Sequence, residues 1–225
     1  MIADWINTTF ASFDYAILEF YHTLAESPAS VILTPVSEFL AIIGDGAIAC
    51  FILAAILLLF KKTRKAGLCI IFSVGFGALI TNIAVKNIVA RPRPYASEVA
   101  QFNEWWSFVG AHLESEFSFP SGHTTAAMAG AMGLCLGYDK RHKWWIFAAS
   151  AVYVILMGAS RNYLMVHYPT DVIAGIISGA IGGALAYLLI HFLYKGLKGN
   201  RDVKFCSFIL NWSIVDLFKK KAKTK

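Results

Sequence analysis

The stretch from Ala47 to Phe60 reads Ala-Ile-Ala-Cys-Phe-Ile-Leu-Ala-Ala-Ile-Leu-Leu-Leu-Phe and contains no charged residue. The residues that follow it are basic, at Lys61, Lys62, Arg64 and Lys65. The run shows no periodicity, and the residues before it extend it toward the roughly 20 apolar residues that cross a bilayer. We therefore predict that it is a membrane-spanning helix.

Four more apolar segments of this kind follow along the chain. They cover residues 67–85, 120–139, 144–160 and 172–194. The composition agrees, since 57% of the 225 residues are hydrophobic and the mean hydropathy is +0.59, well above what a water-soluble domain needs. The sequence predicts an all-α, polytopic membrane protein with five transmembrane helices.

The N-terminal part of the chain follows a different pattern. An apolar face predicts an interfacial helix that ends before Pro28, and its residues are Tyr15, Ile17, Leu18, Phe20, Tyr21 and Leu24. A second helix is expected over residues 31–43, but Pro35 and Glu38 make this segment a poor membrane span.

Three regions are expected from these patterns. Residues 1–43 form N-terminal interfacial helices or a possible sixth span, residues 44–198 form the membrane core, and residues 199–225 form a basic amphipathic tail. In the tail, apolar residues that can share one helix face precede a run of lysines. We expect this tail to lie on anionic lipid.

The charged residues predict the orientation of the helices. The net charge of +6 does not indicate nucleic-acid binding, because the basic residues sit in short clusters between apolar runs, at 61–65, 140–143 and 195–204. These clusters fall on one face, which the positive-inside rule places in the cytoplasm. The chain is expected to lie in the cell membrane with its opposite face on the extracytoplasmic side.

Ionisable side chains gather at that opposite face, at alternate ends of successive helices. They are Lys86, Arg91, Arg93, His123, Arg161, His167 and Asp171. Charged groups in such positions are costly unless they have a role, and Arg91 and Arg93 go against the positive-inside rule. This grouping predicts a binding site for an anion.

The start of the third predicted span suits an anion. It reads Pro-Ser-Gly-His over residues 120–123. Ser121 is a good helix N-cap, and Gly122 lets a ligand approach the backbone closely. The exposed N–H groups of a helix start bind anions, so we expect an anion cradle with His123 at its edge.

The start of the last span places an imidazole beside a carboxylate. His167 and Asp171 are four residues apart, and Pro169 is tolerated in a first helical turn. Asp171 can therefore hold one imidazole nitrogen. The other nitrogen is then available as an oriented nucleophile.

Three motifs occur in order along the chain. They are Lys-x6-Arg-Pro from Lys86 to Pro94, Pro-Ser-Gly-His over 120–123, and Ser-Arg-x5-His-x3-Asp from Ser160 to Asp171. With this set, the chain resembles the type 2 phosphatidic acid phosphatase superfamily of membrane lipid phosphatases. Every required residue is present, and the resemblance extends from the second predicted span to the fifth.

The resemblance implies a role for each matched residue. His167 is expected to attack phosphorus and become a phosphohistidine, with Asp171 orienting its ring, and His123 is expected to act as the general acid and then the general base. The residues expected to bind the substrate phosphate are Lys86, Arg93, Ser121, Gly122 and Arg161. No metal and no other cofactor is expected.

The implied substrate is a lipid with a phosphate or diphosphate headgroup. The short, single-domain chain resembles bacterial members that act on undecaprenyl diphosphate, which is the substrate we expect, with phosphatidic acid or phosphatidylglycerol phosphate as the alternative. A lipid transporter that binds headgroups without hydrolysis is the alternative of another class. It predicts ionisable residues near the bilayer middle and broken helices, whereas here these residues collect at one face.

Three features lie outside the motifs. Arg91 is expected to contact lipid headgroups or to support its loop. The aromatic residues within 105–108 predict an interfacial belt. Glycines at every fourth position from Gly175 to Gly183 predict close packing of the last helix within the subunit.

Overall fold

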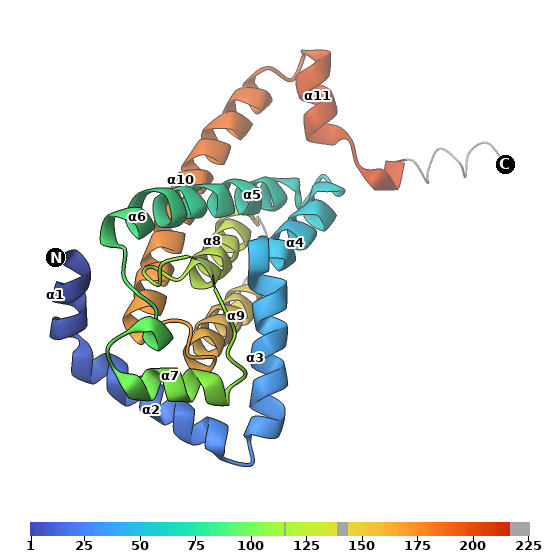
Figure 1. Cartoon of the computed structure of the whole chain (residues 1–225). Coiled ribbons are helices and arrows are strands. Elements are labelled where there is room, and N and C mark those ends of the chain that lie inside the picture. The colour runs from blue at the N-terminus through green and yellow to red at the C-terminus, as the bar shows by residue number, and fades with distance from the viewer. Residues whose placement is uncertain (115, 139–143, 217–225) are drawn as a thin grey trace.

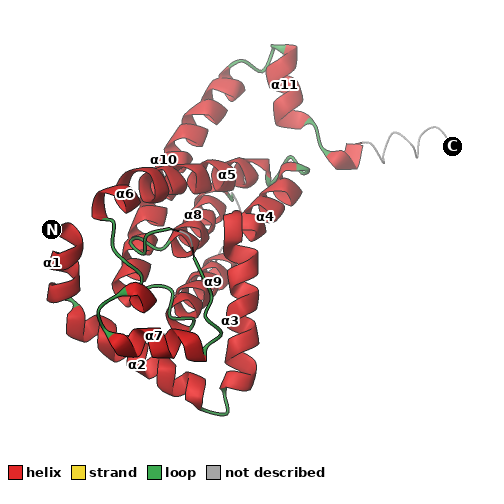
Figure 2. Cartoon of the chain, in the orientation of Figure 1, coloured by secondary structure: helices red, strands yellow, loops and turns green. Residues whose placement is uncertain are grey.

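The structure is a computed structural model that describes residues 1–114, 116–138 and 144–216, and every regular element in these residues is a helix (Figure 1; Figure 2). The predicted all-α class is confirmed for this part of the chain. The elements in chain order are α1 (Ile2–Thr9), α2 (Ala11–Glu26), α3 (Ser30–Gly44), η1 (Asp45–Ala47), α4 (Ile48–Leu58), α5 (Arg64–Ala78), η2 (Leu79–Val85), α6 (Lys86–Val89), η3 (Pro94–Ala96), α7 (Ala100–Phe108), α8 (Gly122–Gly137), α9 (Trp144–Tyr163), α10 (Pro169–Gly199) and α11 (Lys204–Asn211).

Four helical segments in the described residues are long and apolar enough to cross a membrane. They are Ser30–Leu58, Arg64–Ala96, Trp144–Tyr163 and Pro169–Gly199. The remaining predicted span corresponds to α8, which is helical over 16 residues. Its predicted end at residue 139 lies outside the described residues. The chain is therefore a polytopic helical membrane protein.

The first spanning segment begins earlier than the sequence indicated. α3 contains Pro35, and a kink over 45–47, where Gly46 has φ of 53°, joins α3 to α4. Residues 31–43, predicted to be a helix but a poor span, belong to a segment of 29 residues that is long and apolar enough to cross a membrane. Pro35 lies inside α3, past its first turn, and the helix continues through it although proline has no N–H to donate.

α8 packs between α5 and α10 at the centre of the molecule (Figure 1). A Cβ atom on Gly175 would lie 2.7 Å from the carbonyl oxygen of Ser121, and one on Gly179 would lie 2.5 Å from that of Thr125. The predicted close packing of the last helix within the subunit is confirmed. It brings the first turn of α10 beside the start of α8, where the N–H of Ser121 donates to the Asp171 carbonyl at 3.0 Å.

The amphipathic helix α2 covers the loop between α9 and α10. Leu18 is fully buried, and Tyr15 and Leu24 pack beside it against residues 163–168. Most of the face predicted to meet lipid therefore contacts protein, whereas Phe20 is exposed. Trp105, predicted to join an interfacial belt, is buried in the same cluster, and its ring centroid lies 5.4 Å from that of Tyr15.

The basic segment after α4 lies against the C-terminal tail. Nη2 of Arg64 donates to the carbonyl of Trp212 at 2.5 Å, and the N–H of Ile214 donates to the carbonyl of Leu59 at 3.0 Å. Figure 1 shows α11 at the opposite end of the molecule from α2 and α7. The basic residues at 61–65 thus lie at the same end as the tail. The second basic cluster, at 140–143, and the lysines after 216 lie outside the described residues.

Candidate active site

The three motifs meet at one cavity of 440 Å³. The predicted site residues that line it are Lys86, Arg93, Gly122, His123 and His167. The other predicted residues, Ser121, Arg161 and Asp171, are buried. The fold therefore brings residues from η2, α6, α8, α9, α10 and their loops to one place, as the motifs predicted.

The loop between α9 and α10 holds His167 rigidly. Met165 has φ of 56°, a conformation that residues other than glycine rarely adopt. The side-chain amide of Asn162 donates to the carbonyl of His167 at 3.0 Å, and the His167 side chain is almost fully buried. Strain of this kind persists only where the surrounding packing enforces it, so the imidazole has one defined position.

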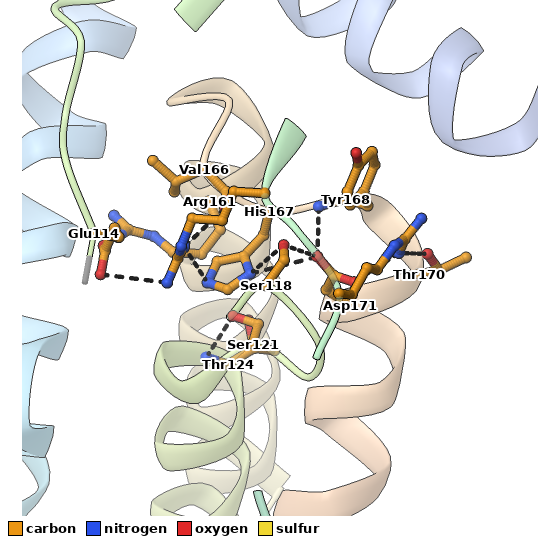
Figure 3. Close-up of polar contacts among 12 residues, drawn as sticks. Glu114, Ser118, Ser121, Thr124, Arg161, Val166, His167, Tyr168, Thr170 and Asp171 are labelled. Carbon is orange, nitrogen blue, oxygen red and sulfur yellow. Dashed lines mark hydrogen bonds and ion pairs between the residues drawn. The ribbon is translucent and has the colours of Figure 1, made fainter. Parts of the chain in front are cut away.

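The imidazole of His167 is oriented from both sides (Figure 3). Nε2 lies 3.3 Å from Nη1 of Arg93, and Nδ1 lies 3.5 Å from Oδ2 of Asp171. A guanidinium only donates, so Nε2 is the acceptor and the ring proton is on Nδ1. Burial lowers the pKa of His167 to about 3. The ring is therefore neutral at pH 7, and Nε2, the nitrogen that faces away from Asp171, carries the lone pair that a nucleophile needs.

Asp171 accepts hydrogen bonds from Tyr168 and Ser118, which are not among the predicted site residues. Its Oδ2 accepts hydrogen bonds from the N–H of Tyr168 at 2.9 Å and from the hydroxyl of Ser118 at 2.5 Å. Ser118 Oγ also lies 3.4 Å from Nδ1 of His167, so this serine connects the two residues (Figure 3). Ser118 precedes the Pro-Ser-Gly-His motif in a loop, and no spacing in the sequence indicated it.

Arg91 is the main correction to the predicted site. It is 1% exposed, and it donates to Oδ1 of Asp171 at 2.7 Å and to Oδ2 of Asp14 at 2.8 Å. Of the two predicted roles, contact with lipid headgroups is therefore wrong, while a supporting role within the protein agrees with these contacts. A buried guanidinium requires carboxylate partners, and these lie 80 and 77 residues away in the sequence.

The cations predicted to bind phosphate contact two carboxylates in the loop before α8. Lys86 pairs with Glu116, while guanidinium nitrogens of Arg93 and Arg161 lie 3.8 Å and 3.6 Å from the carboxylate of Glu114. Nη2 of Arg161 is buried and has no hydrogen-bond partner among the described residues. The carboxylate oxygens of Glu114 and Glu116 thus lie where the oxygens of a phosphate could bind. Nη2 of Arg161 is a buried donor available to a ligand.

The start of α8 has the predicted form. Ser121 is the N-cap, and its Oγ accepts from the N–H of Thr124 at 3.4 Å. A Cβ atom on Gly122 would lie 3.8 Å from Nζ of Lys86, so this helix start adjoins the cations. His123 lines the cavity, and its Nε2 lies 3.3 Å from a backbone carbonyl of α3. Across the described residues, no group of three or more His, Cys, Asp and Glu side chains is placed to hold a metal ion.

The fold and the cavity define a polytopic membrane protein with a site that combines basic and acidic side chains and contains two histidines. Residues 66–195, more than half of the chain, match the PAP2 superfamily. The chain therefore belongs to the PAP2 family of lipid phosphatases, as its motifs predicted.

Similar proteins include enzymes with different named substrates. The chain is 32% identical over 137 residues to the undecaprenyl-diphosphatase of Sulfolobus acidocaldarius, covering 59% of each chain. It is 31% identical over 151 residues to phosphatidylglycerophosphatase B of Bacillus subtilis, covering 64% of each chain. The matched regions thus span less than two thirds of these two relatives.

A solved structure supports the fold over a longer region. The first transmembrane PAP2-type phosphatidylglycerolphosphate phosphatase from Bacillus subtilis has a TM-score of 0.61 and 25% sequence identity to this chain. The similarity covers 87% of this chain and 91% of that one. The shared fold therefore extends beyond the segment that carries the three motifs.

Proposed function

We propose that this chain removes a phosphate group from a phosphorylated or diphosphorylated lipid through a phosphohistidine at His167. The observation that carries the proposal is the neutral imidazole of His167, whose Nε2 lies 3.3 Å from Arg93. A phosphate bound by Arg93 would lie beside this nitrogen, where proximity and orientation favour attack. Membership of a phosphatase family supports the same class of reaction.

The proposed reaction has two steps. In the first, Nε2 of His167 forms a bond to phosphorus, the bond from phosphorus to the lipid-side oxygen breaks, and His123 protonates that oxygen. Asp171 stabilises the positive charge on the ring. In the second, water attacks phosphorus, His123 accepts its proton, the phosphorus–nitrogen bond breaks and inorganic phosphate leaves. Both histidines then return to their starting states.

In this proposal, basic side chains of the protein neutralise the negative charge of the transferring phosphoryl group. Its oxygens replace the Glu114 and Glu116 carboxylates beside the cations, and the buried Nη2 of Arg161 gains an acceptor. The proposed phosphate ligands are Lys86, Arg93, Arg161, the hydroxyl of Ser121 and the N–H of Gly122. The reaction therefore needs no metal ion.

We propose undecaprenyl diphosphate as the substrate and the extracytoplasmic membrane face as the place of reaction. The cavity supports a lipid, because its lining continues from the cations to Phe51, Val74 and Ala78 on α4 and α5. The Sulfolobus relative is named for undecaprenyl diphosphate. The Bacillus relative is named for phosphatidylglycerophosphate, so phosphatidylglycerol phosphate or phosphatidic acid is the second candidate. The basic segments at the opposite end support the proposed orientation.

The test is phosphate release from the purified protein in detergent with undecaprenyl diphosphate, phosphatidic acid and phosphatidylglycerol phosphate. We expect release to be fastest from undecaprenyl diphosphate and to be lost in His167→Ala. Comparable rates on all three lipids would overturn the proposed preference for undecaprenyl diphosphate but not the proposed hydrolysis. Full activity of His167→Ala would overturn the proposed phosphohistidine intermediate. A lipid transporter without hydrolysis would release no phosphate from any of them.

A further inference from the structure

Asp14, in the N-terminal helix α2, is connected to the candidate active site. It is 2% exposed, and each of its carboxylate oxygens accepts a hydrogen bond from Thr170 in the first turn of α10. Oδ1 accepts from the N–H of Thr170 at 3.0 Å, and Oδ2 accepts from its hydroxyl at 2.8 Å. Oδ2 also accepts from Nη2 of Arg91 at 2.8 Å. Thr170 directly precedes Asp171, so Asp14 anchors the backbone next to that carboxylate.

Arg91 has a buried position between Asp14 and Asp171. Its Nη1 donates to Oδ1 of Asp171 and to the hydroxyl of Thr170, both at 2.7 Å, and its Nε donates to Asn7 at 2.7 Å. The guanidinium carbon lies 3.7 Å from the ring centroid of Tyr168. Arg91 does not line the cavity that contains His167, so its charge serves this buried network.

The guanidinium of Arg91 donates to both carboxylates, that of Asp14 and that of Asp171. An arginine with a single carboxylate partner favours a bidentate pair that uses both oxygens. Here Asp14 takes Nη2, and Asp171 receives only Nη1 at Oδ1. Oδ2 of Asp171 therefore remains available to Ser118 and His167. Without Asp14, Arg91 would be free to turn toward both oxygens of Asp171.

We infer that Asp14 is a positioning residue for catalysis, which fixes Arg91 and Thr170 so that Asp171 presents Oδ2 to His167. This inference rests on the proposed function, because it concerns the rate at which His167 attacks. It assigns a part of the catalytic arrangement to the N-terminal helix, outside the three motifs.

The test compares Asp14→Asn with Glu19→Gln, an exposed carboxylate on the same helix. We expect Asp14→Asn to lower kcat by about tenfold, as for other residues that orient a reacting group, with KM and the inhibition constant for inorganic phosphate within about twofold of wild type. Glu19→Gln should match wild type. A kcat of Asp14→Asn equal to that of Glu19→Gln would overturn the inference. Equal losses in kcat and in the affinity for inorganic phosphate would also overturn it, since they indicate general distortion.

A second variant separates positioning from folding, because removing one partner of a buried ion pair destabilises a protein. Arg91 also pairs with Asp171, so the effect of Asp14→Asn is measured in the wild type and again in an Arg91→Gln background. If Asp14 acts through Arg91, the loss of kcat by about tenfold seen in the wild-type background should largely disappear in the Arg91→Gln background. An equal loss of kcat in both backgrounds would overturn the inference. If Asp14→Asn does not fold, Thr170→Ala removes the hydroxyl that donates to Asp14 and should lower kcat with unchanged KM.

The wild type and His167→Ala serve as reference points for both proposals. Absence of phosphate release from the wild type would overturn the proposed function itself. Release that depends on His167 but not on Asp14 would leave the proposed function standing and overturn the inference alone.

Discussion

Nη1 of Arg93 lies 3.3 Å from Nε2 of His167, so the cation predicted to bind the phosphate also orients the predicted nucleophile. Arg93 is anchored to the backbone as well, since it donates to the carbonyls of Val166 and Glu116, each at 2.8 Å. These bonds hold the guanidinium in place before a ligand arrives. Preorganised donors of this kind stabilise developing charge without rearrangement.

Arg93→Lys is expected to lower kcat/KM for phosphate release by about 10²-fold. Lysine keeps the charge, but a single ammonium group cannot reproduce the backbone bonds and the contact with Nε2 of His167 together. The measurement is steady-state phosphate release in detergent. Arg201→Lys, in the exposed segment before α11, is the matched control and should retain wild-type values. Wild-type kcat/KM in Arg93→Lys would contradict the assignment.

Ser118→Ala is expected to lower kcat by about tenfold and to leave KM unchanged. The variant loses the hydroxyl between Oδ2 of Asp171 and Nδ1 of His167, but no group that contacts the phosphate. Ser107→Ala, at an exposed position of α7, controls for the loss of a hydroxyl. A change in KM with unchanged kcat would show that Ser118 acts on binding instead.

Glu116→Gln is expected to tighten phosphate binding, lowering KM and the inhibition constant for vanadate by about threefold. The half-exposed carboxylate of Glu116 pairs with buried Lys86, so it competes with an incoming phosphate oxygen. The effect is small because such ion pairs contribute little in contact with water. Glu104→Gln, exposed on α7, is the control. Weaker vanadate binding in Glu116→Gln would mean that Glu116 supports Lys86.

His167 is expected to make the protein less stable in acid. Burial lowers the pKa of His167 to about 3, below the ordinary value of 6.5. As the pH falls below about 6.5, the unfolded chain binds a proton at this residue and the folded chain does not, so stability falls with pH. The loss of Tm between pH 7 and pH 4.5 should be smaller in His167→Gln by on the order of 5 °C.

The exposed His191 supplies the control for this pH dependence. His191→Gln should follow the wild-type curve of Tm against pH. Parallel curves for His167→Gln and the wild type would show that His167 takes up its proton without loss of the fold.

Treatment with EDTA is expected to leave phosphate release unchanged. Lys86, Arg93 and Arg161 supply the positive charge that a metal ion provides in other phosphatases. The measurement compares activity after dialysis against EDTA with activity after dialysis against buffer. Loss of activity that magnesium restores would contradict the metal-independent reaction.

Much of the fold could be predicted from apolar runs and their boundaries. The helix that contains Lys86 ends at Val89, with Ala90 as its C-cap, just before Pro92 and Pro94, which cannot continue a regular helix. The start of the first span was predicted less well. Pro35 indicated a break, but the tertiary structure tolerates it and continues the apolar segment across the kink at 45–47.

The candidate site could be predicted where chemistry depends on local spacing. His167 directly precedes the N-cap of α10 and Asp171 lies in the first turn of that helix, and their contact of 3.5 Å agrees with the four-residue spacing. Ser118, Glu114 and Glu116 could not be selected, because a long loop has no periodicity that indicates where its side chains point. For the same reason the buried carboxylate partners of Arg91 could not be predicted.

The sequence by itself determined the membrane class, the family and the residues of the three motifs, because hydropathy and short spacings are local properties of the chain. Only the tertiary structure decided which groups support them. Asp14 meets Thr170 across 156 residues, and Arg91 meets Asp171 across 80. Such pairs form because packing of α2 and α10 excludes water and leaves each buried charge dependent on the other.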